Sequence, residues 1–432
     1  MKKIIALLLV VVMALGLIAC GQAPESAAPA ATDAAPAATE AAKEEAAAPE
    51  AITLKVWGPA EDQTIPSEAE SFLRVACEKF DEAHPEWDIT FVFEVCAEGD
   101  AGGMVTKDPS AAADVYMYAN DQLGQLLQAN AIARLGGAVE EQVKADNSEA
   151  MVATVSKDGA LYGVPYAINT WFMYYDKSVY TEEDIKSLDA MMAKKPVGFE
   201  VTNTWYLPAF YYAAGGTMFG ADGTNGAEGV KFGGENGTAA TLYVANALAE
   251  GKMIEGGGGA GLDAMRAGTI GAMFSGTWDA KNYSDVLGEN YAAAQLPCIT
   301  INGQECQLKS FAGSKAYGVN PNSANMKAAS ALAAWLGSAE MQDLHFEIRN
   351  GEVVPCALTL LAGDKYSANP AAVAQEATFS NTSVIQPNIP EMGAYWTNAN
   401  PMGQALVNGE INADNAAAKT EEWNTGLNNT GL

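Results

Sequence analysis

The residues of this chain best suited to chemistry are aromatic side chains that stand beside carboxylates and amides. Tyr118, Asp121 and Gln122 follow a predicted strand, and Trp205 and Trp278 stand at the ends of further elements. An aromatic ring offers a flat apolar face, whereas carboxylates and amides offer directional hydrogen bonds. This combination suits a neutral sugar ring, which has a flat C–H face and hydroxyl groups at its rim.

Composition excludes several other kinds of chemistry. The 432 residues include 53 acidic and 24 basic side chains, a formal charge of -29, so a general nucleic-acid binder is excluded. Two histidines, His84 and His345, leave little scope for a histidine triad or a histidine-rich zinc site. We expect no metal and no cofactor. Paired carboxylates need no histidine, so Glu61 or Asp62 with Asp121 leave a carbohydrate-cleaving enzyme open.

The elements that must position these side chains alternate between strands and helices. Residues 52–56 alternate as a strand, 68–83 have helical spacing, and 89–95 alternate again, which predicts a parallel strand–helix–strand unit. Further strands are expected at 114–118 and 270–274, and alanine-rich helices at 324–336, 340–350 and 370–379. The pattern predicts an α/β protein of two lobes, whose ligand would lie in loops that follow strands.

The first fifty residues predict export and anchoring. Lys2 and Lys3 precede an apolar run over 4–18, which suits a signal peptide but is too short to span a bilayer. The run ends at Ala19 and Cys20, and this resembles the bacterial lipobox, in which the cysteine is lipidated. Residues 1–20 are therefore predicted to be a lipoprotein signal peptide, and 21–50, rich in Ala, Pro and Glu, a disordered tether.

Five cysteines remain beyond Cys20, and an odd number cannot pair completely. Their spacings fit no compact disulfide framework. Cys298 and Cys306 flank a predicted turn at Asn302 and Gly303, so they are the pair to test first, with buried free thiols as the alternative.

The stretch 386–396, Gln-Pro-Asn-Ile-Pro-Glu-Met-Gly-Ala-Tyr-Trp, resembles a segment of the maltose- and maltodextrin-binding proteins, a family of substrate-binding proteins of ABC transporters. In that family the segment ends in an aromatic pair whose tryptophan stacks on a glucose ring. The resemblance therefore implies that Tyr395 and Trp396 bind substrate.

Other motifs carry the same resemblance, which extends over about residues 51–427. Residues 114–122 resemble the segment with a stacking aromatic, a hydroxyl-binding aspartate and an arginine, and only the arginine is replaced. Residues 162–169 resemble the first crossing between the lobes, where the family has a glutamate, and Gly276-Thr277-Trp278 resembles a stacking motif of the second lobe. The resemblance implies this set of substrate-binding residues: Glu61, Asp62, Asp100, Tyr118, Asp121, Gln122, Asn169, Trp205, Trp278, Tyr395 and Trp396.

The resemblance also implies a fold, a two-lobed periplasmic-binding-protein-like structure with a hinge of three crossings near 167–171, 312–317 and 364–370. One lobe would comprise 51–168 plus 317–366, and the other 169–316 plus 367–432. The implied function is that of a monomeric lipoprotein, anchored by Cys20 at the extracellular face of the cell membrane. It would capture malto-oligosaccharides between the lobes, without catalysis, and deliver them to the permease subunits of an ABC importer.

Three alternatives stay open at this point. The ligand could be another oligosaccharide, since the arginine, a lysine and a glutamate of the family pattern are replaced. A secreted carbohydrate-active enzyme would need two carboxyl groups about 5 to 10 Å apart across the scissile bond. An adhesion lipoprotein would show no lobe closure with small sugars.

Overall fold

The computed structural model describes residues 48–429. Cys20, the predicted signal peptide and nearly all of the predicted tether lie outside the described residues. The first strand, β1 (Glu50–Gly58), already begins at the last residue assigned to the tether. In β1 the side chains of Ile52, Leu54 and Val56 are buried, as the predicted alternation requires.

A six-stranded mixed sheet forms the centre of the first lobe. The strand order is β17-β16-β3-β1-β2, and β6 pairs with β16 beside this path. β1 is parallel to both β2 and β3, as the strand–helix–strand pattern predicts, whereas β16 is antiparallel to β3 and β6. The strands beyond β1 are β2 (Trp87–Val95), β3 (Val115–Ala119), β6 (Val164–Asn169), β16 (Ser310–Val319) and β17 (Ser383–Ile385).

Helices cover this sheet with one apolar face each. α2 (Phe72–Ala83) buries Phe72, Leu73, Ala76 and Phe80 in the first core, which agrees with the helical spacing in the sequence. The other helices of this lobe include α3 (Ala101–Lys107), α4 (Leu123–Gln128), α5 (Ala138–Asp146), α6 (Glu149–Thr154), α12 (Met326–Leu336) and α13 (Ala339–Ile348).

The second lobe has its own mixed sheet and its own core. The strand order is β11-β8-β12-β7-β13, with β7 antiparallel to both neighbours. The strands are β7 (Phe172–Asp176), β8 (Val197–Phe199), β11 (Met253–Glu255), β12 (Ala272–Ser275) and β13 (Tyr291–Ala294). The helices include α7 (Leu188–Lys194), α8 (Pro208–Ala213), α9 (Gly234–Ala249), α10 (Ala260–Arg266), α11 (Ala280–Leu287), α17 (Met392–Asn398), α18 (Asn400–Val407) and α19 (Ala416–Leu427).

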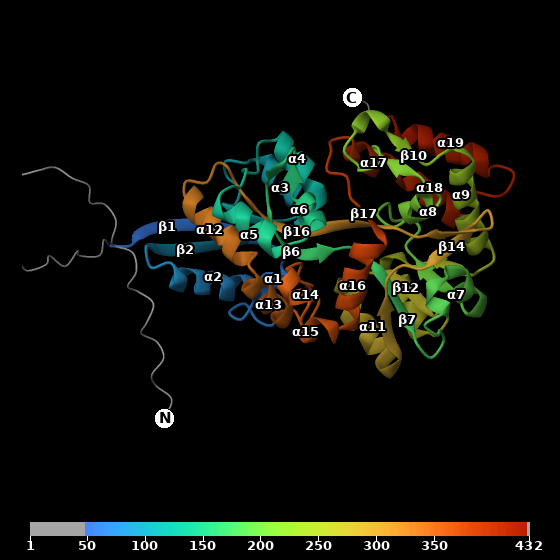
Figure 1. Ribbon diagram of the computed structural model, residues 1–432, viewed down its shortest axis with the longest axis horizontal. Coiled ribbons are helices and arrows are strands. Elements are labelled where there is room, and N and C mark those ends of the chain that lie inside the picture. Colours follow the sequence, from blue (N-terminus) through green and yellow to red (C-terminus); the bar gives the residue numbers. More distant parts are fainter. Residues whose placement is uncertain (1–47, 430–432) are drawn as a thin grey trace, which may run out of the picture. The chain divides into compact units, whose positions relative to one another are not determined.

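Three segments connect the two cores. β6 contributes Ala167 to the first core, and Trp171 directly after it belongs to the second. β16 contributes Tyr317 to the first core and Phe311 to the second, so one continuous strand serves both lobes (Figure 1). The third passage lies between α15 (Asp364–Ser367), whose Tyr366 clusters with Phe346 of the first lobe, and α16 (Pro370–Asn381), whose Ala374 clusters with Phe172 of the second. These passages support the predicted lobe boundaries, which we keep as a proposal.

Two further observations concern the described part of the chain. No helix within residues 48–429 has the length and apolar character needed to cross a bilayer. In the hairpin of β14 (Cys298–Ile301) and β15 (Gln304–Gln307), Cys298 pairs with Gln307 and Cys306 pairs with Ile299. Since adjacent strand positions face opposite sides, the two thiols lie on opposite faces, and both are free. The register therefore contradicts a disulfide between them.

Candidate functional site

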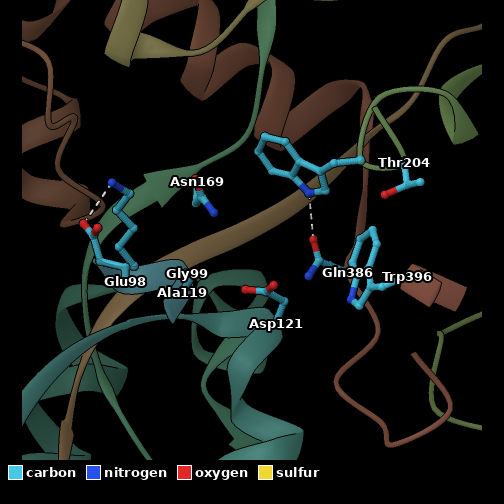
Figure 2. A pocket seen from close by; sticks show the side chains of 10 residues that line it. Glu98, Gly99, Ala119, Asp121, Asn169, Thr204, Gln386 and Trp396 are labelled. Carbon is cyan, nitrogen blue, oxygen red and sulfur yellow. Dashed lines mark hydrogen bonds and ion pairs between the residues drawn. The ribbon is translucent and has the colours of Figure 1, made fainter. Parts of the chain in front are cut away.

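A cavity of about 410 Å³ lies between the two lobes, within the size range usual for small-molecule sites. Figure 2 shows Glu98 and Trp396 at opposite sides of it, with Asn169 and Asp121 between them. Four predicted binding residues are in its wall, namely Asp121, Asn169, Trp205 and Trp396. The full lining is Glu98, Gly99, Ala119, Asp121, Asn169, Thr204, Trp205, Lys315, Gln386 and Trp396.

Asp121 lies in a short 3-10 turn, η2 (Asn120–Gln122), directly after β3. The turn is fixed to the hinge strand, because the backbone N–H of Ser314 donates to Asn120 Oδ1 at 3.0 Å. A Cβ on neighbouring Gly313 would lie 2.1 Å from the same oxygen, so only glycine fits there. The carboxylate of Asp121 accepts a hydrogen bond from Gln122 Nε2 at 2.9 Å. Burial raises the pKa of Asp121 to about 6.

Glu98 and Lys315 form the charged end of the cavity. Glu98 belongs to the short helix η1 (Glu98–Asp100), and its Oε1 accepts from Lys315 Nζ at 2.9 Å and from Tyr166 Oη at 2.8 Å. Burial alone would raise the pKa of Glu98, but the ammonium group of Lys315 outweighs it and the net shift is downward. The lowered pKa keeps the Glu98 carboxylate charged at neutral pH, and it forms an ion pair with the ammonium group of Lys315.

The second lobe contributes the aromatic side of the cavity. Trp205 Nε1 donates to Gln386 Oε1 at 2.8 Å, which fixes the orientation of the indole (Figure 2). Trp396, on α17, packs edge-on against Phe311 of the hinge strand, with ring centroids 6.0 Å apart. Both rings are partly exposed, as an aromatic platform for a ligand must be.

Tyr395 does not line the cavity, contrary to the predicted aromatic pair. Its side chain is fully buried in the second core, and its Oη donates to the carbonyl oxygen of Thr204 at 2.7 Å. Because Thr204 directly precedes Trp205, Tyr395 supports the loop that carries one of the two platforms. In this structure Tyr395 holds that loop and has no place in the cavity wall.

Tyr118 is the second correction. The sequence places a stacking platform there, but all five residues of β3 are buried and Tyr118 is 0% exposed in the first core. Its hydroxyl group points at Gly163, where a Cβ would lie 2.2 Å from Oη. The next residue, Ala119, lines the cavity instead. The strand alternation therefore turns the aromatic ring into the core and a small side chain toward the cavity.

Asp62 is the third correction, and its neighbour Glu61 does not line the cavity. Asp62 is 1% exposed, and its Oδ1 is paired with His345 Nε2 at 2.9 Å and with the guanidinium group of Arg349. Burial would raise the pKa of Asp62, but the charges and hydrogen bonds of both partners together lower it to about 2. Asp62 therefore links α1 (Glu61–Thr64) to α13, whereas Glu61 is exposed.

Three more predicted residues lie near the cavity without lining it. Gln122 bonds to Asp121, and Asp100 is exposed at the start of α3. Trp278 is 43% exposed and lies beside Trp205, with ring centroids 6.0 Å apart. It could extend the aromatic wall for a longer ligand, and its contact with ligand stays a prediction.

Sequence reasoning missed six residues of the cavity wall, and four of these have polar side chains: Glu98, Thr204, Lys315 and Gln386. One of them carries a visible signal: β16 is apolar or small at nearly every position, and Lys315 is its single charged residue. A charge inside an otherwise buried strand is costly unless it is paired or functional. Gln386 opens the stretch that carries the family resemblance. Glu98 and Thr204 lie in loops without a comparable signal.

The profile of the Bacterial extracellular solute-binding protein family matches residues 76–374. The chain belongs to this family. Membership confirms the predicted class of protein and the prediction that this solute-binding protein is not an enzyme. Among residues 48–429, moreover, no cluster of acidic, cysteine or histidine side chains could hold a metal ion.

Relatives and solved structures agree with this family and differ in ligand. A "Galactooligosaccharide-binding protein" of Bacillus subtilis (strain 168) is 25% identical over 86% of this chain and 93% of its own length. A "Maltooligosaccharide ABC transporter solute-binding lipoprotein" of Streptococcus pneumoniae is 26% identical over 70% of this chain and 74% of its own. A solved structure described as "with acarbose" is 48% identical, with a TM-score of 0.82, and covers 88% of this chain and 100% of its own.

The "Maltodextrin binding protein MalE1 from L. casei BL23" is 24% identical to the solute-binding protein described here. Its TM-score is 0.78, over 88% of this chain and 99% of its own. At this identity the likeness concerns the fold alone. It confirms the predicted two-lobed α/β fold.

Proposed function

We propose that this solute-binding protein captures neutral oligosaccharides, malto-oligosaccharides first among them, for import by an ABC transporter. The observation that carries the proposal is the division of the cavity wall. Asp121 of the first lobe and Lys315 of the hinge strand, which is paired with Glu98, offer hydrogen bonds to hydroxyl groups, while Trp205 and Trp396 of the second lobe offer flat apolar faces. A sugar ring needs both kinds of contact, and lobe closure brings them together.

The choice of malto-oligosaccharides rests on the resemblance and on the relatives. The motif 386–396 is similar to the maltodextrin-binding segment, and its Trp396 lines the cavity. Two relatives are named for maltooligosaccharide and maltodextrin, and the 48% identical structure is described as "with acarbose". Galacto-oligosaccharides are the competing ligand, because a relative that aligns with 86% of this chain is named for them.

The expected partners follow from the same proposal. A lipid on Cys20 would hold the protein at the extracellular face of the cell membrane, and residues 21–50 would act as the tether. The relatives from S. pneumoniae are named as lipoproteins of an ABC transporter, which supports this arrangement. The loaded protein would then dock as a monomer on the permease subunits.

Calorimetric titration with a panel of sugars tests the proposal. The panel contains maltose, maltotriose, maltoheptaose, acarbose, a galacto-oligosaccharide and an oligosaccharide that bears a carboxylate. Saturable binding of the glucose oligomers with a change in tryptophan fluorescence is the expected result. Binding of the galacto-oligosaccharide alone would show that it is the substrate in place of malto-oligosaccharides. Absence of binding with every neutral sugar would overturn the proposal. Incubation with maltoheptaose should leave its chain length unchanged, since the family binds its solute.

A further inference from the structure

Lys315 stands on the hinge strand β16 and lines the cavity, a position that the sequence motifs do not mark. Its side chain is partly exposed, whereas the residues on both sides of it, Ser314 and Ala316, are fully buried. Three N–H groups are available on a lysine ammonium, and one of them is used by Glu98 Oε1. The remaining donors are available to a ligand in the cavity.

The pairing of β6 with β16 is irregular beside Lys315, and this irregularity determines where Tyr166 lies. Lys315 pairs with Ala167, and the next residue, Ala316, pairs with Pro165, so Tyr166 is an extra residue on β6. A β-bulge of this kind redirects side chains and is frequent beside functional sites. Tyr166 Oη donates to the same oxygen of Glu98 that accepts from Lys315 (Figure 2 marks the Glu98 ion pair).

The three groups are held together by the sheet of the first lobe. Tyr166 and Lys315 lie on paired strands, and η1, which carries Glu98, packs on β3 of the same sheet. Tyr166 is 1% exposed and Glu98 is 9% exposed, so both partners of the ammonium group are held in place by the first lobe. Lys315 belongs to the part of the hinge strand that pairs with β3 and β6, so all three groups are attached to one sheet.

We propose that Lys315 is a ligand-contacting, specificity-determining residue, and that Glu98 and Tyr166 are positioning residues that act through it. The inference rests on the proposed function, since it concerns the same cavity. The ammonium group donates to hydroxyl or ring oxygens of a neutral sugar, and Glu98 balances its charge. Asp121 is then the unbalanced charge of the wall, so an oligosaccharide with a carboxylate is disfavoured.

A double-mutant cycle tests this assignment. Dissociation constants are measured by calorimetry, with maltotriose as the probe, for the wild type, Lys315→Met, Glu98→Gln and the double variant. Loss of a hydrogen bond from a charged donor should weaken binding about ten- to a hundredfold in Lys315→Met. Glu98→Gln alone should weaken it less. In the Lys315→Met background Glu98→Gln should not weaken binding further, because Glu98 acts on the ligand only through the ammonium group of Lys315.

Controls separate this role from a loss of folding. Lys177→Met removes the same charge from an exposed turn that does not line the cavity, and it should bind like the wild type. Tyr166→Phe removes only the hydroxyl group, and its loss of affinity should also vanish in the Lys315→Met background. Thermal unfolding of every variant shows whether the fold is intact.

Each outcome has one meaning. Wild-type affinity in a folded Lys315→Met variant overturns the inference and leaves the proposed function standing. Independent, additive losses in the double variant overturn the positioning role of Glu98. A wild type that binds none of the neutral sugars overturns the proposed function, and this inference with it.

Discussion

Two aspartates show how strongly surroundings decide the role of one residue type. Asp62 is enclosed with a histidine and an arginine, so its pKa falls to about 2. Asp121 is desolvated beside the cavity and accepts from Gln122, a neutral amide, so its pKa rises to about 6. The first carboxylate stabilises the fold, and the second is available for a ligand. Matched Asp→Asn substitutions should separate these roles.

For Asp121 we predict pH-dependent sugar affinity. Sugar hydroxyl groups donate to the charged carboxylate, so the ligand lowers the pKa of Asp121 from its free value of about 6. Affinity should be full from about pH 7 upward and should fall as the pH drops through 6, by at most about tenfold per pH unit. Titrations from pH 7.5 to 5 check this. Asp121→Asn should bind more weakly at pH 7.5 and show a nearly flat profile, whereas an unchanged pH profile in the variant would contradict the role.

For Asp62 we predict an effect on stability alone. Its folded pKa of about 2 lies below the ordinary value of 3.8, so its stabilising contribution is present above pH 4 and is lost as the pH falls toward 2. Breaking a buried ion pair costs about 3–5 kcal/mol, so Asp62→Asn should lower the unfolding temperature at pH 7. Sugar affinity should persist below that temperature. The adjacent, exposed Glu61→Gln is the matched control and should change neither quantity.

At the scale of the elements, Tyr118 of β3 faces Gly163 in the segment before β6. Variants of these two residues test whether Tyr118 belongs to the core or to the ligand site. The Tyr118 hydroxyl group is buried and has no hydrogen-bond partner within the described part of the chain, so Tyr118→Phe should be neutral or stabilising. Gly163→Ala should destabilise by about 1–3 kcal/mol, since its methyl group would overlap Oη. The double variant should recover part of this loss in urea unfolding.

A variant of Tyr118 also tests whether this residue contacts the ligand. If Tyr118 were a stacking platform, Tyr118→Phe would still stack, so the informative variant is Tyr118→Leu. It should bind maltotriose as well as the wild type wherever it is folded. A large loss of affinity in a folded Tyr118→Leu protein would return Tyr118 to the binding site.

The elements also show what the sequence could and could not predict. Period-two and helical patterns located β1, α2 and β2 closely, because burial of one face produces those patterns. They did not reveal that β3 is buried on both faces, since Val115–Ala119 reads the same whether Tyr118 faces the core or a ligand. The Glu98–Lys315 pair joins residues 217 positions apart, and only the sheet order brings them together.

At the scale of the whole molecule, the division of the cavity wall predicts closure. Hydrogen-bonding groups of the first lobe and hinge face aromatic groups of the second, so a ligand gains both sets of contacts only when the lobes approach. Small-angle X-ray scattering should therefore show a smaller radius of gyration with saturating maltotriose. An unchanged radius upon binding would contradict closure around the ligand.

Trp396→Ala links closure to a single side chain. Loss of the platform should weaken affinity by about 1–3 kcal/mol, because the ring's apolar face no longer covers the sugar. The variant should also contract less at saturation, since the second lobe has fewer contacts to gain. Trp278→Ala is the matched comparison: this tryptophan is exposed outside the cavity wall, so its removal should cost little with maltotriose and more with maltoheptaose. Equal losses in both variants with maltotriose would place Trp278 in the site itself.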